Sequence, residues 1–147
     1  MKKRDVIKKV AISIKGSPLS QEKENEGFEL MTDGEYMQKN GIQTFSYVES
    51  ELTGLAGLLT TFSVEPNRVV LTRGDGRNGD MVFSEESKHP FLFNTPNGSV
   101  TMVIDTHSIK KEFQDDGGCL EIRYDLEVDN VAVSKNLFRV DIRAFQQ

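Results

Sequence analysis

Hydrophobic and polar side chains alternate along much of this chain, most regularly near its C-terminal end. Charged residues occupy every second position from 121 to 129. The apolar residues that alternate with them are Leu120, Ile122, Tyr124, Leu126 and Val128. This period of two predicts a strand over residues 118–129 with one buried and one solvent-facing side. Asp129 and Asn130 tolerate positive φ angles, so they predict a turn into a second alternating strand, residues 138–144.

Shorter segments of the same kind recur upstream. They cover residues 6–14, 27–32, 42–49, 55–64, 68–73, 80–83, 91–94 and 99–108. Breaks rich in glycine, proline and asparagine separate many of them at spacings of roughly ten residues, which is typical of antiparallel sandwiches and barrels. No amphipathic helix is evident, although Ile109 and Phe113 lie at a spacing that allows one short helical turn. We therefore expect an all-β protein.

Composition and charge narrow the class of protein. The chain has 147 residues, of which 37% are hydrophobic, so it fits one domain over residues 1–147 with a substantial core. The net charge of −5 argues against nucleic-acid binding. No apolar run approaches the roughly 18 residues of a membrane-spanning helix, so we expect no membrane association. The single cysteine, Cys119, excludes an internal disulfide and favours a cytoplasmic location.

Candidate chemistry is sparse. Residues 74–79 lie between two predicted strands and match neither a calcium loop nor a phosphate loop, so they predict a hairpin turn. Cys119 has the parity of the charged face, and as a nucleophile it would need His89 or His107 as a base. These three residues show no spacing that is typical of a zinc site. We predict no catalytic residue, no metal site and no cofactor, and we interpret the protein as non-enzymatic.

Residues 47–55, which read Tyr-Val-Glu-Ser-Glu-Leu-Thr-Gly-Leu, resemble the YwiB-like family of uncharacterised bacterial proteins. The resemblance covers most of the chain, and its other matching positions are Gly57, Thr60, Thr61, Leu71, Arg73, Gly74 and residues 81–83, 95–98, 116–118 and 120–127. Asn97 stands where that family usually has an aromatic residue. The resemblance implies a single antiparallel lipocalin-like, or calycin-like, barrel of about eight to ten strands. It also suggests a bacterial cytoplasmic protein, and it brings no established activity.

Two classes of function fit such a barrel. It can bind one small amphipathic or apolar ligand in its interior. Alternatively, a packed barrel can be a protein-interaction module whose outer face meets a partner protein or a second copy in a homodimer. An open interior with a mouth would favour the ligand, and a filled interior with an exposed apolar patch would favour the interaction module.

Strand parity identifies one candidate ligand site. Arg73 shares the parity of Leu71, so its guanidinium would enter the barrel near one end if that face is the inner one. A buried guanidinium needs a carboxylate, and Glu49, on the parity of Tyr47, is the best internal partner. Three interpretations stay open: an Arg73–Glu49 ion pair that closes the barrel end, an Arg73 that binds an anionic head group, and an outward, solvated Arg73. The candidate ligand-binding residues are Arg73, Glu49, Tyr47, Leu71, Met81 and Phe83.

Overall fold

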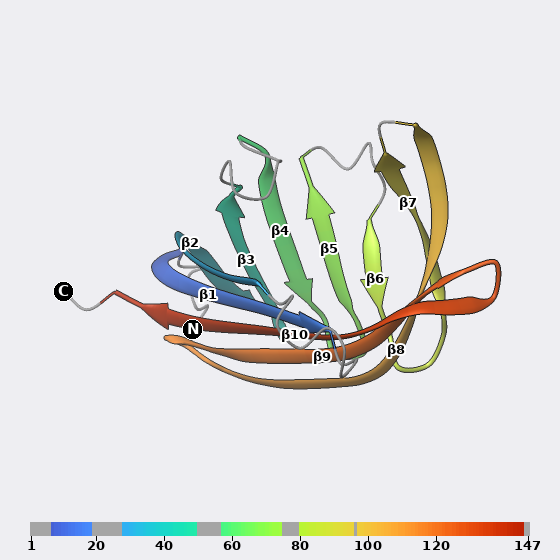
Figure 1. The fold of residues 1–147 in the computed structure, drawn as a ribbon. Coiled ribbons are helices and arrows are strands. Elements are labelled where there is room, and N and C mark those ends of the chain that lie inside the picture. The colour runs from blue at the N-terminus through green and yellow to red at the C-terminus, as the bar shows by residue number, and fades with distance from the viewer. Residues whose placement is uncertain (1–6, 19–27, 50–56, 75–79, 96, 146–147) are drawn as a thin grey trace.

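The computed structural model describes residues 7–18, 28–49, 57–74, 80–95 and 97–145, and every regular element in them is a β-strand (Figure 1). The strands are β1 (Lys8–Pro18), β2 (Phe28–Lys39), β3 (Ile42–Val48), β4 (Leu59–Val64), β5 (Val69–Arg73), β6 (Met81–Phe83), β7 (His89–Thr95), β8 (Gly98–Gln114), β9 (Gly117–Val128) and β10 (Val131–Ala144). No helix in this part of the chain is long and apolar enough to cross a membrane.

The ten strands form one antiparallel sheet in the order β6-β5-β4-β3-β2-β1-β10-β9-β8-β7. Its two edge strands, β6 and β7, follow each other in the chain, and β6 lies against both β7 and β8. The sheet therefore curls into a nearly closed barrel, in which β8, β9 and β10 bend along the base of the view and β3 to β6 rise from it (Figure 1). The expected all-β, single antiparallel barrel of about eight to ten strands is confirmed.

Two of the hairpins turn on residues with positive φ. Asp129 and Asn130 have φ angles of 52° and 66° between β9 and β10, as the sequence predicts. Asn40 and Gly41 have φ angles of 52° and 79° between β2 and β3. Two consecutive residues with positive φ match the right-handed twist of the flanking strands, so these turns fix the register of their hairpins.

The short helical turn that the spacing of Ile109 and Phe113 allows is not formed. Strand β8 continues through both residues, which pair with Ile122 and Gly118 of β9. The sequence interpretation is wrong here because a spacing of four residues is an even number and also satisfies the strand period of two. Of the hairpin turn expected over residues 74–79, only Gly74 is among the described residues, and it has a positive φ of 65°.

Aromatic rings pack closely in the barrel interior. Phe62 stacks on Phe45 with ring centroids 4.7 Å apart and on Phe138 with centroids 5.6 Å apart. Around these rings lie the other apolar side chains that are less than 2% exposed, namely Val10, Ile12, Ile14, Tyr36, Val64, Val69, Ile104, Leu120, Ile122 and Val140. The removal of this apolar surface from water is the main stabilisation of the fold, and it leaves the region around Phe62 tightly packed.

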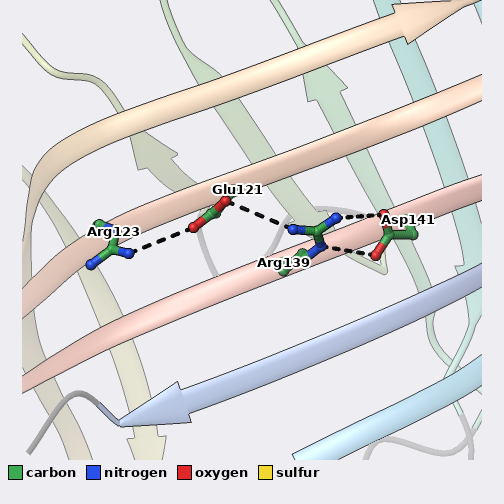
Figure 2. A network of polar contacts seen from close by, with 4 residues as sticks. All are labelled: Glu121, Arg123, Arg139 and Asp141. Atoms are coloured by element: carbon green, nitrogen blue, oxygen red, sulfur yellow. Dashed lines mark hydrogen bonds and ion pairs between the residues drawn. The ribbon is translucent and has the colours of Figure 1, made fainter.

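Charged side chains line the outer face of β9 and β10 (Figure 2). Glu121 lies 3.8 Å from Arg123 and 3.9 Å from Arg139. Arg139 also donates hydrogen bonds of 3.1 and 3.3 Å to Asp141. All four residues have the parity that the sequence predicts to face solvent. Since these groups are mostly near half exposed, the network adds little to stability and keeps the outer face hydrated.

Candidate functional site

Strands β3, β4 and β5 bring the candidate polar residues to one end of the barrel. The register pairs Tyr47 with Thr60 and Thr60 with Arg73, so the three residues form a row across these strands. Glu49 follows β3 directly, and its side chain is 2% exposed. Arg73 Nε lies 4.0 Å from Glu49 Oε2. The structure thus brings Arg73 and Glu49 together, as their parity predicts.

Hydrogen bonds hold the Glu49 carboxylate inside the barrel although the residue lies beyond the end of β3. The backbone N–H of Glu49 donates to the Leu58 carbonyl at 2.8 Å, and the N–H of Gly57 donates to the Glu49 carbonyl at 3.1 Å. The Thr60 hydroxyl donates a buried hydrogen bond of 2.7 Å to Glu49 Oε2. A short hydrogen bond to an ionised acceptor is a strong one, so the carboxylate is firmly positioned.

The Arg73–Glu49 pair is only partly satisfied. Among the described residues, Glu49 Oε1 and Arg73 Nε are buried and have no hydrogen-bond partner. Their charged groups are 4.0 Å apart at the closest, which is too long for a hydrogen bond. The Arg73 side chain is 39% exposed, so it extends from the interior to the barrel end. Both groups therefore keep hydrogen-bonding capacity for a third group.

The candidate apolar residues lie on the inner faces of β5 and β6. Leu71 pairs with Met81, and Phe83 pairs with Val69. Leu71 and Phe83 are buried, and Met81 is half-buried against the core. Phe83 also meets the ring of Tyr124 edge-on, with centroids 5.1 Å apart. Tyr47, Glu49 and Arg73 thus lie at the barrel end, whereas Phe83 lies at the opposite end of β5 from Arg73.

Three further polar residues of this region were missed from the sequence. Thr60 is fully buried beside Glu49. Thr106 is 5% exposed, and its hydroxyl has no partner among the described residues. Tyr124 is the register partner of Thr106 on β9. Threonine is common in strands and a tyrosine on an apolar parity predicts core, so the sequence carries no signal for these roles. We call Tyr47, Glu49, Thr60, Arg73 and Tyr124 the inner polar cluster, and Thr106 lies beside Tyr124 in the sheet.

The environment of this cluster keeps its two phenols neutral. Burial, followed by the Glu49 carboxylate, raises the pKa of Tyr47, while the Arg73 charge acts in the opposite direction. Burial also raises the pKa of Tyr124, again with Arg73 opposing. Both hydroxyls are therefore protonated at neutral pH, and each can donate a hydrogen bond.

Alkaline pH is expected to unfold the protein as its tyrosines ionise. Burial and then the charge of Asp115 raise the pKa of Tyr36 to about 12. An unfolded tyrosine ionises near pH 10, so the contribution of Tyr36 to stability is full below about pH 10 and is lost as the pH rises through about 12. The chain has three tyrosines and no tryptophan, which simplifies a spectroscopic titration.

In that titration, tyrosinate absorbance should rise together with the loss of circular dichroism and not before it. The variant Tyr36→Phe should show a shallower loss of stability between about pH 10 and 12. Full ionisation of all three tyrosines near pH 10 with intact dichroism would contradict the burial described above.

A separate hollow lies on the side of the barrel formed by β1, β8, β9 and β10. It has a volume of about 610 Å³. Residues that line it include Ser13, Glu112, Cys119, Asp141 and Arg143. None of the six candidate ligand-binding residues lines it. This hollow and the inner polar cluster are therefore different places in the fold.

Cys119 lies in this hollow and is not joined to a histidine. His89 has its hydrogen-bond partner in Ser87, and His107 pairs with Asp125, each at 3.0 Å. The register places Cys119 between Glu112 and Asp141 on the neighbouring strands. Neither histidine is therefore placed to act as a base for the Cys119 thiol.

Comparisons with known proteins identify a family and a fold. A family described as a domain of unknown function, DUF1934, matches residues 12–140. The crystal structure of the YwiB protein from Bacillus subtilis is similar, with a TM-score of 0.79, 18% sequence identity and coverage of 95% of this chain and 94% of that chain. The curated proteins give no match. At this sequence identity, the similarity to the solved structure shows a common barrel fold alone.

Proposed function

The chain belongs to the DUF1934 family, a YwiB-like family of unknown function, and we propose that it binds a small ligand with an anionic head group at the end of the barrel that Arg73 lines. The main support is the Arg73–Glu49 pair, in which the buried atoms Arg73 Nε and Glu49 Oε1 have no hydrogen-bond partner among the described residues. Unsatisfied buried polar groups are costly and rare, so they favour a function for the site. A ligand oxygen can accept from the guanidinium, and a ligand hydroxyl can donate to the carboxylate.

The chemistry of the cluster favours a carboxylate or phosphate as the head group. A guanidinium presents several donors in a fixed plane that matches the oxygens of either group. The neutral phenol of Tyr124 adds a further donor, whereas the Tyr47 hydroxyl already interacts with Glu49. The negative charge of Glu49 would repel an anion at this site. The hydrogen bond from Thr60 and the positive charge of Arg73 reduce this repulsion.

The packing of the interior limits the apolar part of this ligand. Phe62 and the two rings that stack on it occupy the region beyond the cluster, so a long acyl chain would have to displace them. Leu71 and its register partner Met81 offer apolar surface near Arg73, and Phe83 continues this surface along β6. We therefore expect a short apolar group rather than a long chain.

The expected result is that the protein binds short-chain carboxylates or alkyl phosphates more tightly than alcohols of the same chain length. The Arg73→Ala variant should lose at least about tenfold in affinity for the anions, which corresponds to about 1.4 kcal/mol, and should lose the preference over the alcohols. Titration calorimetry on the wild type and on Arg73→Ala measures these affinities. Arg68→Ala is a matched control, because Arg68 lies just before β5 and forms an exposed pair with Glu65.

A second measurement separates a binding role from a purely structural one. Removal of Arg73 leaves the buried Glu49 without its cation, so Arg73→Ala should destabilise the fold more than Glu49→Gln, and the double variant should recover part of the loss. Denaturant unfolding gives these free energies. If the wild type binds no anion, or Arg73→Ala binds as well as the wild type, the head-group proposal is wrong. A loss of about 3 kcal/mol or more in Arg73→Ala would then identify a structural ion pair.

A protein-interaction module is the second candidate function. The stacked rings of Phe45, Phe62 and Phe138 support it, because a filled interior leaves the outer face for recognition. Val131 and Val133 are 62% and 54% exposed on the β9–β10 hairpin and provide apolar surface there. Sedimentation of the wild type and of a Val131→Ser/Val133→Ser variant tests whether this hairpin mediates self-association.

A further inference from the structure

The side chains of Asp105, His107 and Asp125 converge on the outer face of β8 and β9. His107 Nε2 lies 3.0 Å from Asp125 Oδ2. One carboxylate oxygen of each aspartate and one ring nitrogen of His107 all lie within 4.8 Å of one another. The three residues alternate with Ile104, Thr106 and Tyr124, which belong to the barrel interior. This group is therefore on the opposite side of the sheet from the inner polar cluster and independent of the function proposed above.

The strand register explains why these residues meet. Asp105 pairs directly with Asp125 across β8 and β9. The pairing then shifts between Thr106 and Ser108, so His107 has no register partner on β9. Such a bulge inserts one extra residue and turns its side chain relative to the regular strand. The bulge thus brings the imidazole of His107 to the Asp125 carboxylate.

This arrangement is unfavourable without a cation. Like charges directly opposite each other on neighbouring strands are destabilising. The Asp105 carboxylate is half-buried and makes no hydrogen bond or ion pair with the described residues, and the Asp125 side chain is 13% exposed.

The neighbouring charges leave a negative surplus at the group. Lys88 forms its ion pair with Glu127 at 3.0 Å, and Asp105 adds a smaller attraction that helps to raise the pKa of Lys88. Lys135 is the register partner of Asp125 on β10. Three carboxylates (Asp105, Asp125 and Glu127) against two lysines give a net charge of −1 with His107 neutral.

We propose that Asp105, His107 and Asp125 bind a divalent transition-metal ion, with Zn²⁺, Co²⁺ and Mn²⁺ as the matching class. Metal–ligand bonds of about 2.0–2.2 Å place neighbouring ligand atoms roughly 3–3.5 Å apart, and the His107–Asp125 distance of 3.0 Å fits this spacing. A nitrogen and two carboxylate oxygens suit these ions better than Mg²⁺ or Ca²⁺, which prefer oxygen ligands alone. His107 Nε2 would bind the metal in its unprotonated form. The His107 side chain is 52% exposed, so water would complete the coordination.

Zinc titration of tag-free protein tests the proposal. The wild type is expected to bind one equivalent, and Asp105→Asn, His107→Gln and Asp125→Asn should each weaken binding at least tenfold. His89→Gln and Cys119→Ser are matched controls, because they remove the other histidine and the only thiol of the chain. Both controls should bind zinc as the wild type does. Circular dichroism without metal shows whether each variant is folded.

Imidazole NMR signals of the wild type give a second readout that needs no ligand-site variant. The chain has two histidines, so His89→Gln assigns both sets of signals. Zinc should shift the His107 signals and leave those of His89 unchanged. The proposal is overturned if millimolar zinc moves neither set, if His89 or Cys119 proves to be the ligand, or if His107→Gln binds zinc as tightly as the wild type.

Discussion

Replacement of Phe62 by alanine is expected to lower the free energy of unfolding by about 3–5 kcal/mol, the usual loss for a buried phenylalanine. Phe62 is fully buried, and its ring stacks on both Phe45 and Phe138. The truncation removes apolar contact and leaves a cavity between two rings, which a rigid barrel cannot collapse to fill. Chemical denaturation followed by circular dichroism measures the loss.

Phe145 provides the matched control for this variant. It is 50% exposed beyond β10, so Phe145→Ala should change the stability by no more than about 0.5 kcal/mol. If the two alanine variants lose similar stability, the stacked rings are not the centre of the core, and the limit that they place on ligand size also fails.

Replacement of Gly34 by alanine is the second change with a large expected effect. A Cβ at Gly34 would collide with the carbonyl oxygen of Ser46 and with Cδ1 of Ile12. The Ile12 side chain can rotate, but the Ser46 carbonyl belongs to β3 and moves only if that strand shifts away from β2. We expect a loss of about 3 kcal/mol, at the upper end for overpacking, by thermal or denaturant unfolding.

Gly41→Ala is the control for the Gly34 variant. Nothing lies within 4 Å of a Cβ at Gly41, so only its left-handed conformation opposes the change. That conformation costs an alanine about 1–2 kcal/mol. A Gly34→Ala variant that is as stable as Gly41→Ala would show that β2 and β3 do not approach as closely as described.

The sequence predicts the strands better than the contacts between them. Alternation at residues 118–129 and 138–144 identifies β9 and β10, because one face of each strand is buried and the other is wet. The same rule of parity places Arg73 and Glu49 inside the barrel. The rule fails where a spacing fits both the helical and the strand period, as at Ile109 and Phe113. It also does not predict where a strand begins or ends.

Contacts that depend on register are beyond the sequence pattern. Asp105 and Asp125 are far apart in the chain, and only the pairing of β8 with β9 makes them neighbours. The bulge at His107 has no signal in the sequence, so neither histidine shows a recognisable metal-binding spacing. The sequence also gives no sign that Thr60 and Thr106 are buried, because threonine suits both faces of a strand.

The ladder between β1 and β10 joins the two ends of the chain and holds the two halves of the sheet together. It runs from the pair Val10–Ala144 to the pair Pro18–Asn136, whereas every other ladder of the described sheet joins strands that are consecutive in the chain. Hairpins on either side of the β1–β10 ladder can form locally. The ladder itself must close a loop of about 130 residues, so its formation is slow. During synthesis β1 therefore emerges long before β10 and presents an unpaired edge. Such an edge can recruit strands of other chains, so the nascent protein is most vulnerable to aggregation until β10 arrives.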